Sequence, residues 1–184
     1  MARLLGLGRL RGPGRHERAA FQLYGAAVAA ARDPWFYQAL GVPDTLDGRF
    51  DMVSLHAFLL IHRLTGEPEP GPTLAQAVFD AMFSDMDINL REMGVGDLGV
   101  SRRVRAMWEA FHGRANAYQA AMGDPANLEA ALVRNVWRGA TPPAGAAAAL
   151  GRIVLTHATH LAGQPLDALA AGDVKFAPAA EAIA

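Results

Sequence analysis

The segment 50–64, FDMVSLHAFLLIHRL, constrains the fold most, because it is apolar on nearly every side when it is drawn as a helix. One face carries Phe50, Val53, Ala57, Leu60, Ile61 and Leu64, and the opposite face carries Met52, Leu55 and Leu59. A helix that is hydrophobic all round is stable in water only when other elements surround it. The sequence therefore predicts a central buried helix with a shell of helices packed around it.

The rest of the chain predicts helices and no strands. Apolar residues recur with helical spacing in 17–32, 73–93, 101–122, 125–137 and 144–161, with short helices at 35–40 and 165–171. Aspartate followed by proline, at residues 33–34 and 124–125, is a typical helix start. We predict an all-α fold, one irregular helical domain of about seven or eight helices around a central apolar helix. Its predicted parts are a flexible basic segment at 1–15, a helical domain at 16–172 and a loose tail at 173–184.

Composition excludes several classes of site. The chain has 184 residues and no cysteine, so it has no disulfide, thiolate metal site or cysteine nucleophile. The formal net charge of −1 and a pI near 6.6 argue against specific DNA binding. The first 15 residues are an exception, since they carry arginines among leucines and glycines. They suggest an alternative role as a peripheral membrane or ribosome adaptor.

The segment 73–93 combines an apolar ridge with acidic borders. Phe79, Met82, Phe83, Met86 and Met93 share one face of the predicted helix. Thr73 and Gln76 are spaced as a capping box at its start. Methionine fills irregular cores but also lines surfaces that accept varied apolar partners, so both interpretations stay open.

No pattern in the chain predicts an active site. The segment 94–99, GVGDLG, has the glycine spacing of a dinucleotide loop but follows a helix instead of a strand. Asp85 and Asp87 suggest a metal- or prenyl-diphosphate-dependent helical enzyme as an alternative, although they lie about 200° apart on a helix and have no second acidic helix. His157 falls on an apolar face, which favours a hydrogen-bonded core histidine over a metal ligand. We expect no catalytic residue, no metal and no cofactor.

Three arginines lie unfavourably near the start of the predicted helix 101–122. Arg102, Arg103 and Arg105 carry positive charge where the helix dipole disfavours it. We therefore predict an acidic partner for them elsewhere.

Four segments resemble one protein family. They are LYGAAVAAAR (23–32), FYQALGVPDTLDGRFDMVSLHAFLLIHRL (36–64), LAQAVFDAMFSDMDINLREMGVGDLGV (74–100) and RNVWRG (134–139). Together they resemble the ubiquinol–cytochrome c chaperone family, assembly factors for cytochrome b of the respiratory cytochrome bc complex. The resemblance implies an all-helical chaperone that is not an enzyme and that binds newly made cytochrome b. It also implies a small helper protein or the ribosomal exit region as further partners, and a cytoplasmic location peripheral to the inner membrane, or the matrix side of a mitochondrion.

The charged residues in the matching segments form our hypothesis for a partner-binding surface. A new membrane protein exposes apolar helices and basic loops, which suit an apolar surface with acidic borders. The assigned residues are Asp44, Asp47, Arg49, Asp51, Asp85, Asp87, Asn89, Arg91, Glu92, Met86 and Met93. The alternative is that Arg49 or Arg91 pairs with these acids only to hold helices together.

Overall fold

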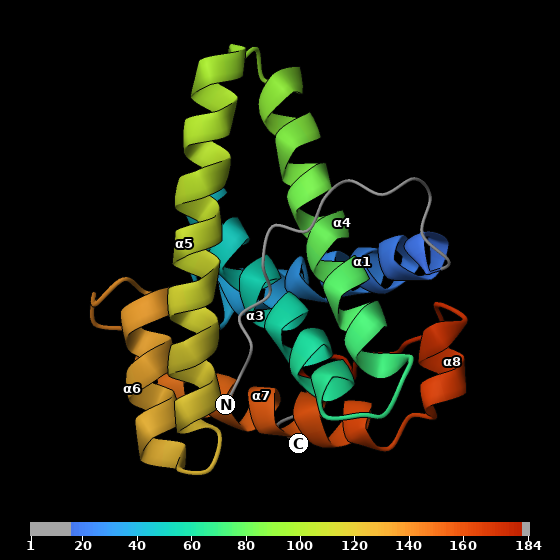
Figure 1. Ribbon diagram of the computed structural model, residues 1–184. Coiled ribbons are helices and arrows are strands. Elements are labelled where there is room, and N and C mark those ends of the chain that lie inside the picture. Colours follow the sequence, from blue (N-terminus) through green and yellow to red (C-terminus); the bar gives the residue numbers. More distant parts are fainter. Residues whose placement is uncertain (1–15, 182–184) are drawn as a thin grey trace.

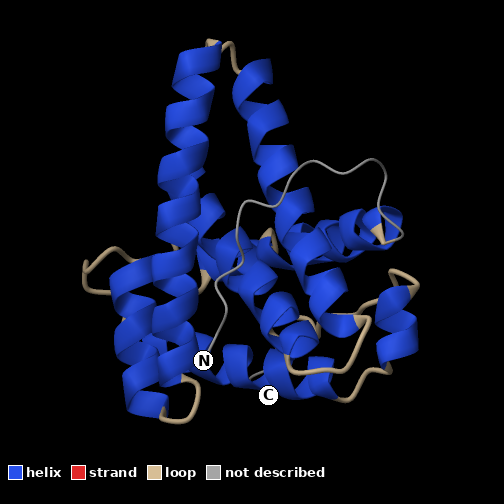
Figure 2. Cartoon of the chain, viewed as in Figure 1, coloured by secondary structure: helices blue, strands red, loops and turns tan. Residues whose placement is uncertain are grey.

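The chain folds into eight helices within residues 16–181, which are the residues that the computed structural model describes (Figure 1). They are α1 (Glu17–Ala31), α2 (Pro34–Gln38), α3 (Leu46–Thr65), α4 (Gly71–Glu92), α5 (Asp97–Ala121), α6 (Pro125–Val136), α7 (Ala146–Ala162) and α8 (Leu166–Ala170). This described part has no strand (Figure 2). The predicted all-α class is confirmed, whereas the basic segment 1–15 lies outside the described residues.

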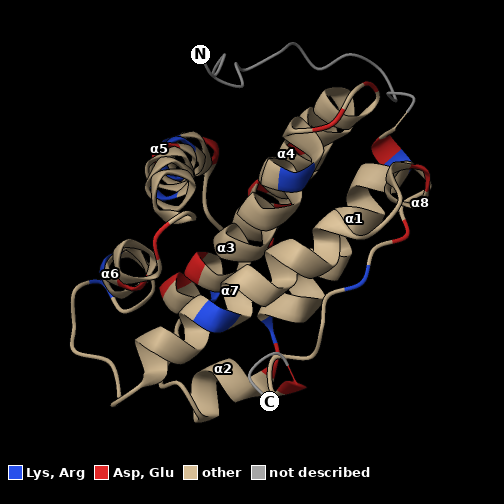
Figure 3. Ribbon diagram, turned by 90° about the horizontal axis from the view of Figure 1, so that it is seen from below, with Lys and Arg blue, Asp and Glu red and all other residues tan. Residues whose placement is uncertain are grey.

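Helix α3 is the centre of the fold, as its apolar sequence predicts. All of its residues from Asp51 to Ile61 are buried, and it packs against α1, α4, α5, α6 and α7. Helix α1 covers one side of it and has charged residues only at its N-terminal end (Figure 3). The core therefore lies along α3, with the other helices arranged around it.

Local capping explains where the helices begin and corrects several predicted boundaries. The Asp33 side chain accepts a hydrogen bond from the Trp35 backbone N–H, and Asp124 does the same for α6, so both predicted caps are confirmed. Helix α3 begins at Leu46, earlier than predicted, because Thr45 accepts from the backbone N–H of Gly48. The turn predicted around Gly48 is in fact the first turn of α3.

Helices α4 and α5 also begin earlier than the sequence predicted. The capping box at Thr73 is wrong, because α4 begins at Gly71 and the Thr73 hydroxyl donates to Glu69. Helix α5 begins at Asp97, after an uncapped Gly96, so the glycine-rich turn is shorter than predicted. Asp97 in the first turn suits the positive end of the helix dipole. Both shifts lengthen the hairpin that α4 and α5 form.

The outer halves of α4 and α5 project from the body as an arm of two helices (Figure 1). We define the arm as residues 83–108. The inner half of α4 packs on α1 and α3, while α5 packs on α6 and α3 below the arm. Within the arm Met86, Leu90 and Val100 are buried, whereas Phe83, Met107 and Trp108 are only partly buried.

The segment after α8 returns to the core. His157 is buried, and its Nε2 atom lies 2.9 Å from the Ala177 carbonyl oxygen, so the predicted hydrogen-bonded core histidine is confirmed. The Phe176 ring packs against His157 and His56. The domain boundary after residue 172 stays a prediction, although Phe176 and Ala179 pack on the helical core.

Candidate protein-interaction surface

The residues assigned to the partner-binding surface lie on two parts of the structure. One group lies in the loop before α3 and in its first turns: Asp44, Asp47, Arg49 and Asp51. The other lies on the outer half of α4, from Asp85 to Glu92, with Met93 just after it. The two groups differ in accessibility, which decides what each can bind.

Asp51 is a buried counter-charge and is not part of an accessible surface. Its side chain is 0% exposed, and its two oxygens pair with Arg114 of α5 at 2.6 Å and with Arg138 after α6 at 3.0 Å. Burial raises the pKa of Asp51, while the hydrogen bond from Arg138 and the charge of Arg114 act to lower it. For Asp51, the alternative that an ion pair holds helices together is the better interpretation, although its partners are not the arginines that the sequence suggested.

Arg138 belongs to the same cluster and was missed at the sequence level. It bonds Asp47 at 3.1 Å as well as Asp51, and it has φ of 54°, a conformation that non-glycine residues rarely adopt. Just before it, the buried Trp137 donates to the Leu40 carbonyl oxygen. The RNVWRG run therefore fixes the end of α6 to the start of α3. Nothing in the spacing of Asp51 and Arg138, 87 residues apart, indicates this contact.

Asp44 and Arg49 form an exposed ion pair at 2.6 Å. The Arg49 guanidinium lowers the pKa of Asp44 through this hydrogen bond. Exposed pairs contribute little to stability, because water and salt screen them and two side chains must be ordered. This pair is accessible but isolated from the acidic residues of the arm.

Arg91 connects the two helices of the arm. Its guanidinium bonds Asp87 one turn earlier in α4, at 2.6 Å, and Asp97 at the start of α5. This network spans the turn between the helices and fixes the tip. Arg91 and Asp87 therefore have a structural role, even though both are solvent-accessible.

Asp85 and Asn89 also have partners within the protein. The Tyr24 hydroxyl of α1 donates to Asp85 at 2.9 Å, and Asn89 donates to the Asp85 backbone carbonyl within α4. Burial, followed by the nearby Asp85 charge, raises the pKa of Tyr24. Glu92 is exposed and has no hydrogen bond or ion pair to any residue in 16–181. Among the predicted acids of α4, Glu92 is thus the one most available to a partner.

Exposed apolar side chains gather near the tip of the arm. Met93 is 52% exposed, Ile88 is 49% exposed and Leu98 is 91% exposed, whereas Met86 is buried. Of the two predicted methionines only Met93 is therefore accessible. Ile88 and Leu98 were missed, because Ile88 lies off the apolar ridge and Leu98 was assigned to a turn. Exposed apolar residues beside charged ones are typical of sites that contact another surface.

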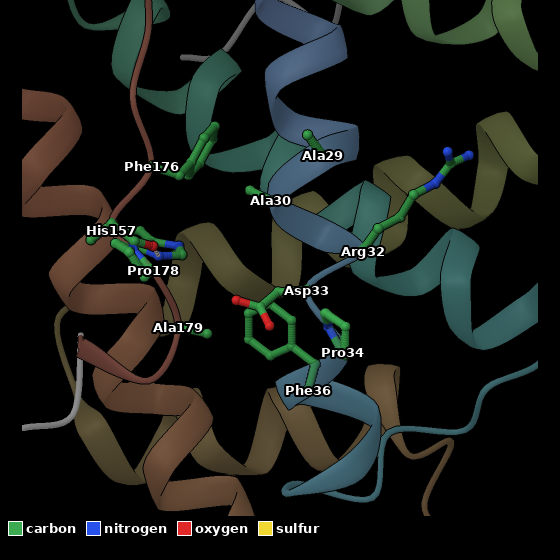
Figure 4. Close-up of a pocket in the computed structure, with 11 residues that line it drawn as sticks. Ala29, Ala30, Arg32, Asp33, Pro34, Phe36, His157, Phe176, Pro178 and Ala179 are labelled. Carbon is green, nitrogen blue, oxygen red and sulfur yellow. Dashed lines mark hydrogen bonds between the residues drawn. The ribbon is translucent and has the colours of Figure 1, made fainter.

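A cavity of about 370 Å³ lies between the α1–α2 corner and the C-terminal segment (Figure 4). Ala29, Pro34, Phe36 and Phe176 supply apolar walls, and the Arg32 guanidinium points away from His157. The Asp33 carboxylate is already used as the cap of α2. Within residues 16–181 no group of three or more His, Asp or Glu side chains could hold a metal ion. The His157 imidazole, which also lines the cavity, already lies within hydrogen-bond distance of the Ala177 carbonyl oxygen.

Comparisons with known proteins agree on one family. Residues 38–176 match the family model described as ubiquinol-cytochrome C chaperone. A Xenopus laevis protein, ubiquinol-cytochrome-c reductase complex assembly factor 1, is 26% identical over 119 residues, which cover 64% of this chain and 60% of that protein. The crystal structure of the Cbp3 homolog from Brucella abortus is 40% identical, with a TM-score of 0.80 over 91% of this chain and 93% of that one.

Proposed function

The chain belongs to the ubiquinol–cytochrome c chaperone family, and we propose that it assists assembly of ubiquinol–cytochrome c reductase by binding newly made cytochrome b. The observation that carries the proposal is the family match itself. It runs from residue 38 to residue 176 and so includes the central helix α3 and the whole arm. We infer a binding role without a catalytic step.

The accessible α4 side of the arm is the surface that we assign to the client. Glu92 supplies unpaired negative charge there, and Met93 and Ile88 supply apolar area. A membrane protein that has not yet assembled exposes apolar helices with basic residues in their cytoplasmic loops. An apolar helix can dock on exposed side chains of this kind, while complementary charges set its orientation.

The cluster around Asp51 is left out of the client surface. Asp51 is fully buried and already paired with Arg114 and Arg138. Asp47 shares Arg138 and lies beside this cluster. The role of this cluster in the proposal is to hold α5, and therefore the arm, against the body.

Deleting the gene in its host tests the function. We expect loss of cytochrome b haem absorbance and of quinol oxidation by the reductase, with the cytochrome b transcript unchanged. Normal haem spectra and normal quinol oxidation in the deletion strain would contradict the proposal. Purified protein that releases heat when titrated with magnesium and a prenyl diphosphate would instead favour the enzyme alternative.

Complementation with a variant of the arm tests the surface. The double variant Glu92→Lys/Met93→Gln reverses the free charge and removes apolar contact, so we expect about tenfold weaker capture of cytochrome b. Both side chains are exposed, so the melting temperature should not change. Asp44→Lys is the matched control, since it changes an exposed acid away from the arm. Equal capture by the control and the arm variant would refute the assignment of the surface.

A further inference from the structure

The two helices of the arm carry opposite charge near the tip. Within the arm, residues 83–92 of α4 contain three carboxylates and one arginine, a net charge of −2. Residues 97–108 of α5 contain one carboxylate, Asp97, and three arginines, a net charge of +2. The arm therefore has an acidic α4 edge and a basic α5 edge, and the client surface proposed above uses only the acidic one.

Two of the three arginines on the α5 edge have no acidic partner within residues 16–181. Arg102 and Arg103 are exposed and have no ion pair or hydrogen bond to any residue in 16–181. Arg105 pairs only with Glu109, one turn further along the same helix, at 3.1 Å. Two positive charges close to the helix N-terminus are thus free to pair with an anion outside the described chain.

Leu98 indicates which anionic partner fits. It is the most exposed large apolar side chain of residues 16–181, and it lies one helical turn before Arg102 on the same face of α5. A nucleic acid would pair with the arginines but leave the leucine in water. At the surface of an anionic bilayer, arginines meet lipid phosphates while an adjacent apolar side chain enters the acyl boundary.

We propose that the α5 edge of the arm, formed by Leu98, Arg102 and Arg103, contacts the surface of an anionic lipid bilayer. Asp97 does not oppose this contact strongly, because Arg91 already pairs with it. Glu92 belongs to the other helix of the hairpin. The contact is peripheral, since no helix of the described residues is long and apolar enough to span a membrane. It goes beyond the proposed function, because it requires no client.

A fluorescent label at residue 98 tests whether the tip reaches the acyl boundary. The chain has no cysteine, so Leu98→Cys provides a single labelling site in the full chain. We expect a blue shift of an environment-sensitive fluorophore with vesicles of phosphatidylcholine and phosphatidylglycerol, but not with phosphatidylcholine alone. Leu46→Cys is the control, because Leu46 is 67% exposed on the body, and its label should not shift. The proposal is overturned if the emission of the fluorophore at residue 98 does not shift with anionic vesicles. It is also overturned if the emission shifts with protein concentration before vesicles are added, a result that would indicate a second copy of the chain as the partner.

Removal of the two free arginines tests the charge. Each arginine near an anionic surface contributes about fivefold in partitioning, so we expect Arg102→Gln/Arg103→Gln to bind the anionic vesicles about 30-fold more weakly in co-sedimentation. The double variant Arg134→Gln/Arg152→Gln is the matched control, because it removes two exposed arginines away from the arm, and it should bind like the unaltered protein. The double variant Arg9→Gln/Arg11→Gln tests whether the basic N-terminal segment, and not the arm, binds the vesicles. Loss of binding only in that variant overturns the proposal, as does unchanged binding by Arg102→Gln/Arg103→Gln.

Discussion

Replacing Asp51 with alanine tests whether its ion cluster holds the body of the protein together. Asp51 is fully buried, and the side chain of its partner Arg114 is only 13% exposed. The substitution would leave the Arg114 charge buried without a counter-ion, because Arg138 supplies only positive charge. Removing one partner of a buried ion pair typically costs about 3–5 kcal/mol in the free energy of unfolding. For a chain of this size we expect the melting temperature to fall by roughly 6–20 °C.

Urea unfolding followed by far-UV circular dichroism measures this cost. Asp44→Ala is the control, since its exposed pair with Arg49 should contribute about 0–1 kcal/mol. The double variant Asp51→Ala/Arg114→Met should recover most of the loss, because it removes the orphaned charge and keeps an apolar side chain of similar length. If Asp51→Ala costs no more than Asp44→Ala, or if the double variant is less stable than the single one, the buried-charge argument is refuted.

Three further substitutions test other parts of the packing. Burial and the neighbouring imidazole of His157 lower the pKa of His56 to about 3, so below pH 6.5 the unfolded chain binds a proton at this residue that the folded chain does not. His56 should therefore account for a loss of about 2 kcal/mol in the free energy of unfolding between pH 7 and pH 5. In urea titrations His56→Phe should make the pH dependence less steep, although His157, whose pKa burial also lowers, keeps its own contribution, and an unchanged slope would contradict the argument. Gly48→Ala should lower the free energy of unfolding by about 1–3 kcal/mol, because the new Cβ atom would lie 2.0 Å from the Pro43 carbonyl oxygen. This clash should outweigh the better helix propensity of alanine, and a variant that is more stable in thermal melts would be inconsistent with it. Tyr24→Phe should cost about 1–2 kcal/mol by removing the hydrogen bond to Asp85, and a thermal melt identical to that of the unaltered chain would show that the bond does not contribute.

Features that depend on neighbouring residues were predictable from the sequence. The caps at Asp33 and Asp124 lie within three residues of the N–H groups that they bond, so residue type and order suffice to find them. The segment 50–64 has apolar residues on opposite faces, which requires a buried position in any fold. The all-helical class and the central place of α3 follow from these local properties.

Helix starts were less predictable, because the local signals for a turn and for a helix start compete there and differ little in strength. The sequence around Gly48 is also typical of a turn, but in the structure the Thr45 cap and the close approach of Gly48 to the Pro43 carbonyl oxygen mark the first turn of α3. Similarly, the glycines of residues 94–99 favour a turn, yet α5 begins at Asp97. At α3 the local cap at Thr45 outweighs the turn preference of Asp47 and Gly48, and at α5 Asp97 pairs with Arg91 across the turn.

The tertiary structure alone decided which charged residues are available to a partner. In the sequence Asp51 and Glu92 are both acids within family-matching segments, but Asp51 is buried between Arg114 and Arg138, whereas Glu92 is exposed on the arm. The partners of Asp51 are 63 and 87 residues away, and no helical period relates residues at such separations. The sequence by itself determined that the chain is helical, that α3 is buried and that acids and arginines follow each other along residues 85–105. Only the packing of α4 against α5 placed those charges on opposite edges of one projecting arm. The helical period determines on which face of a helix a residue lies, but tertiary contacts decide whether that face is covered.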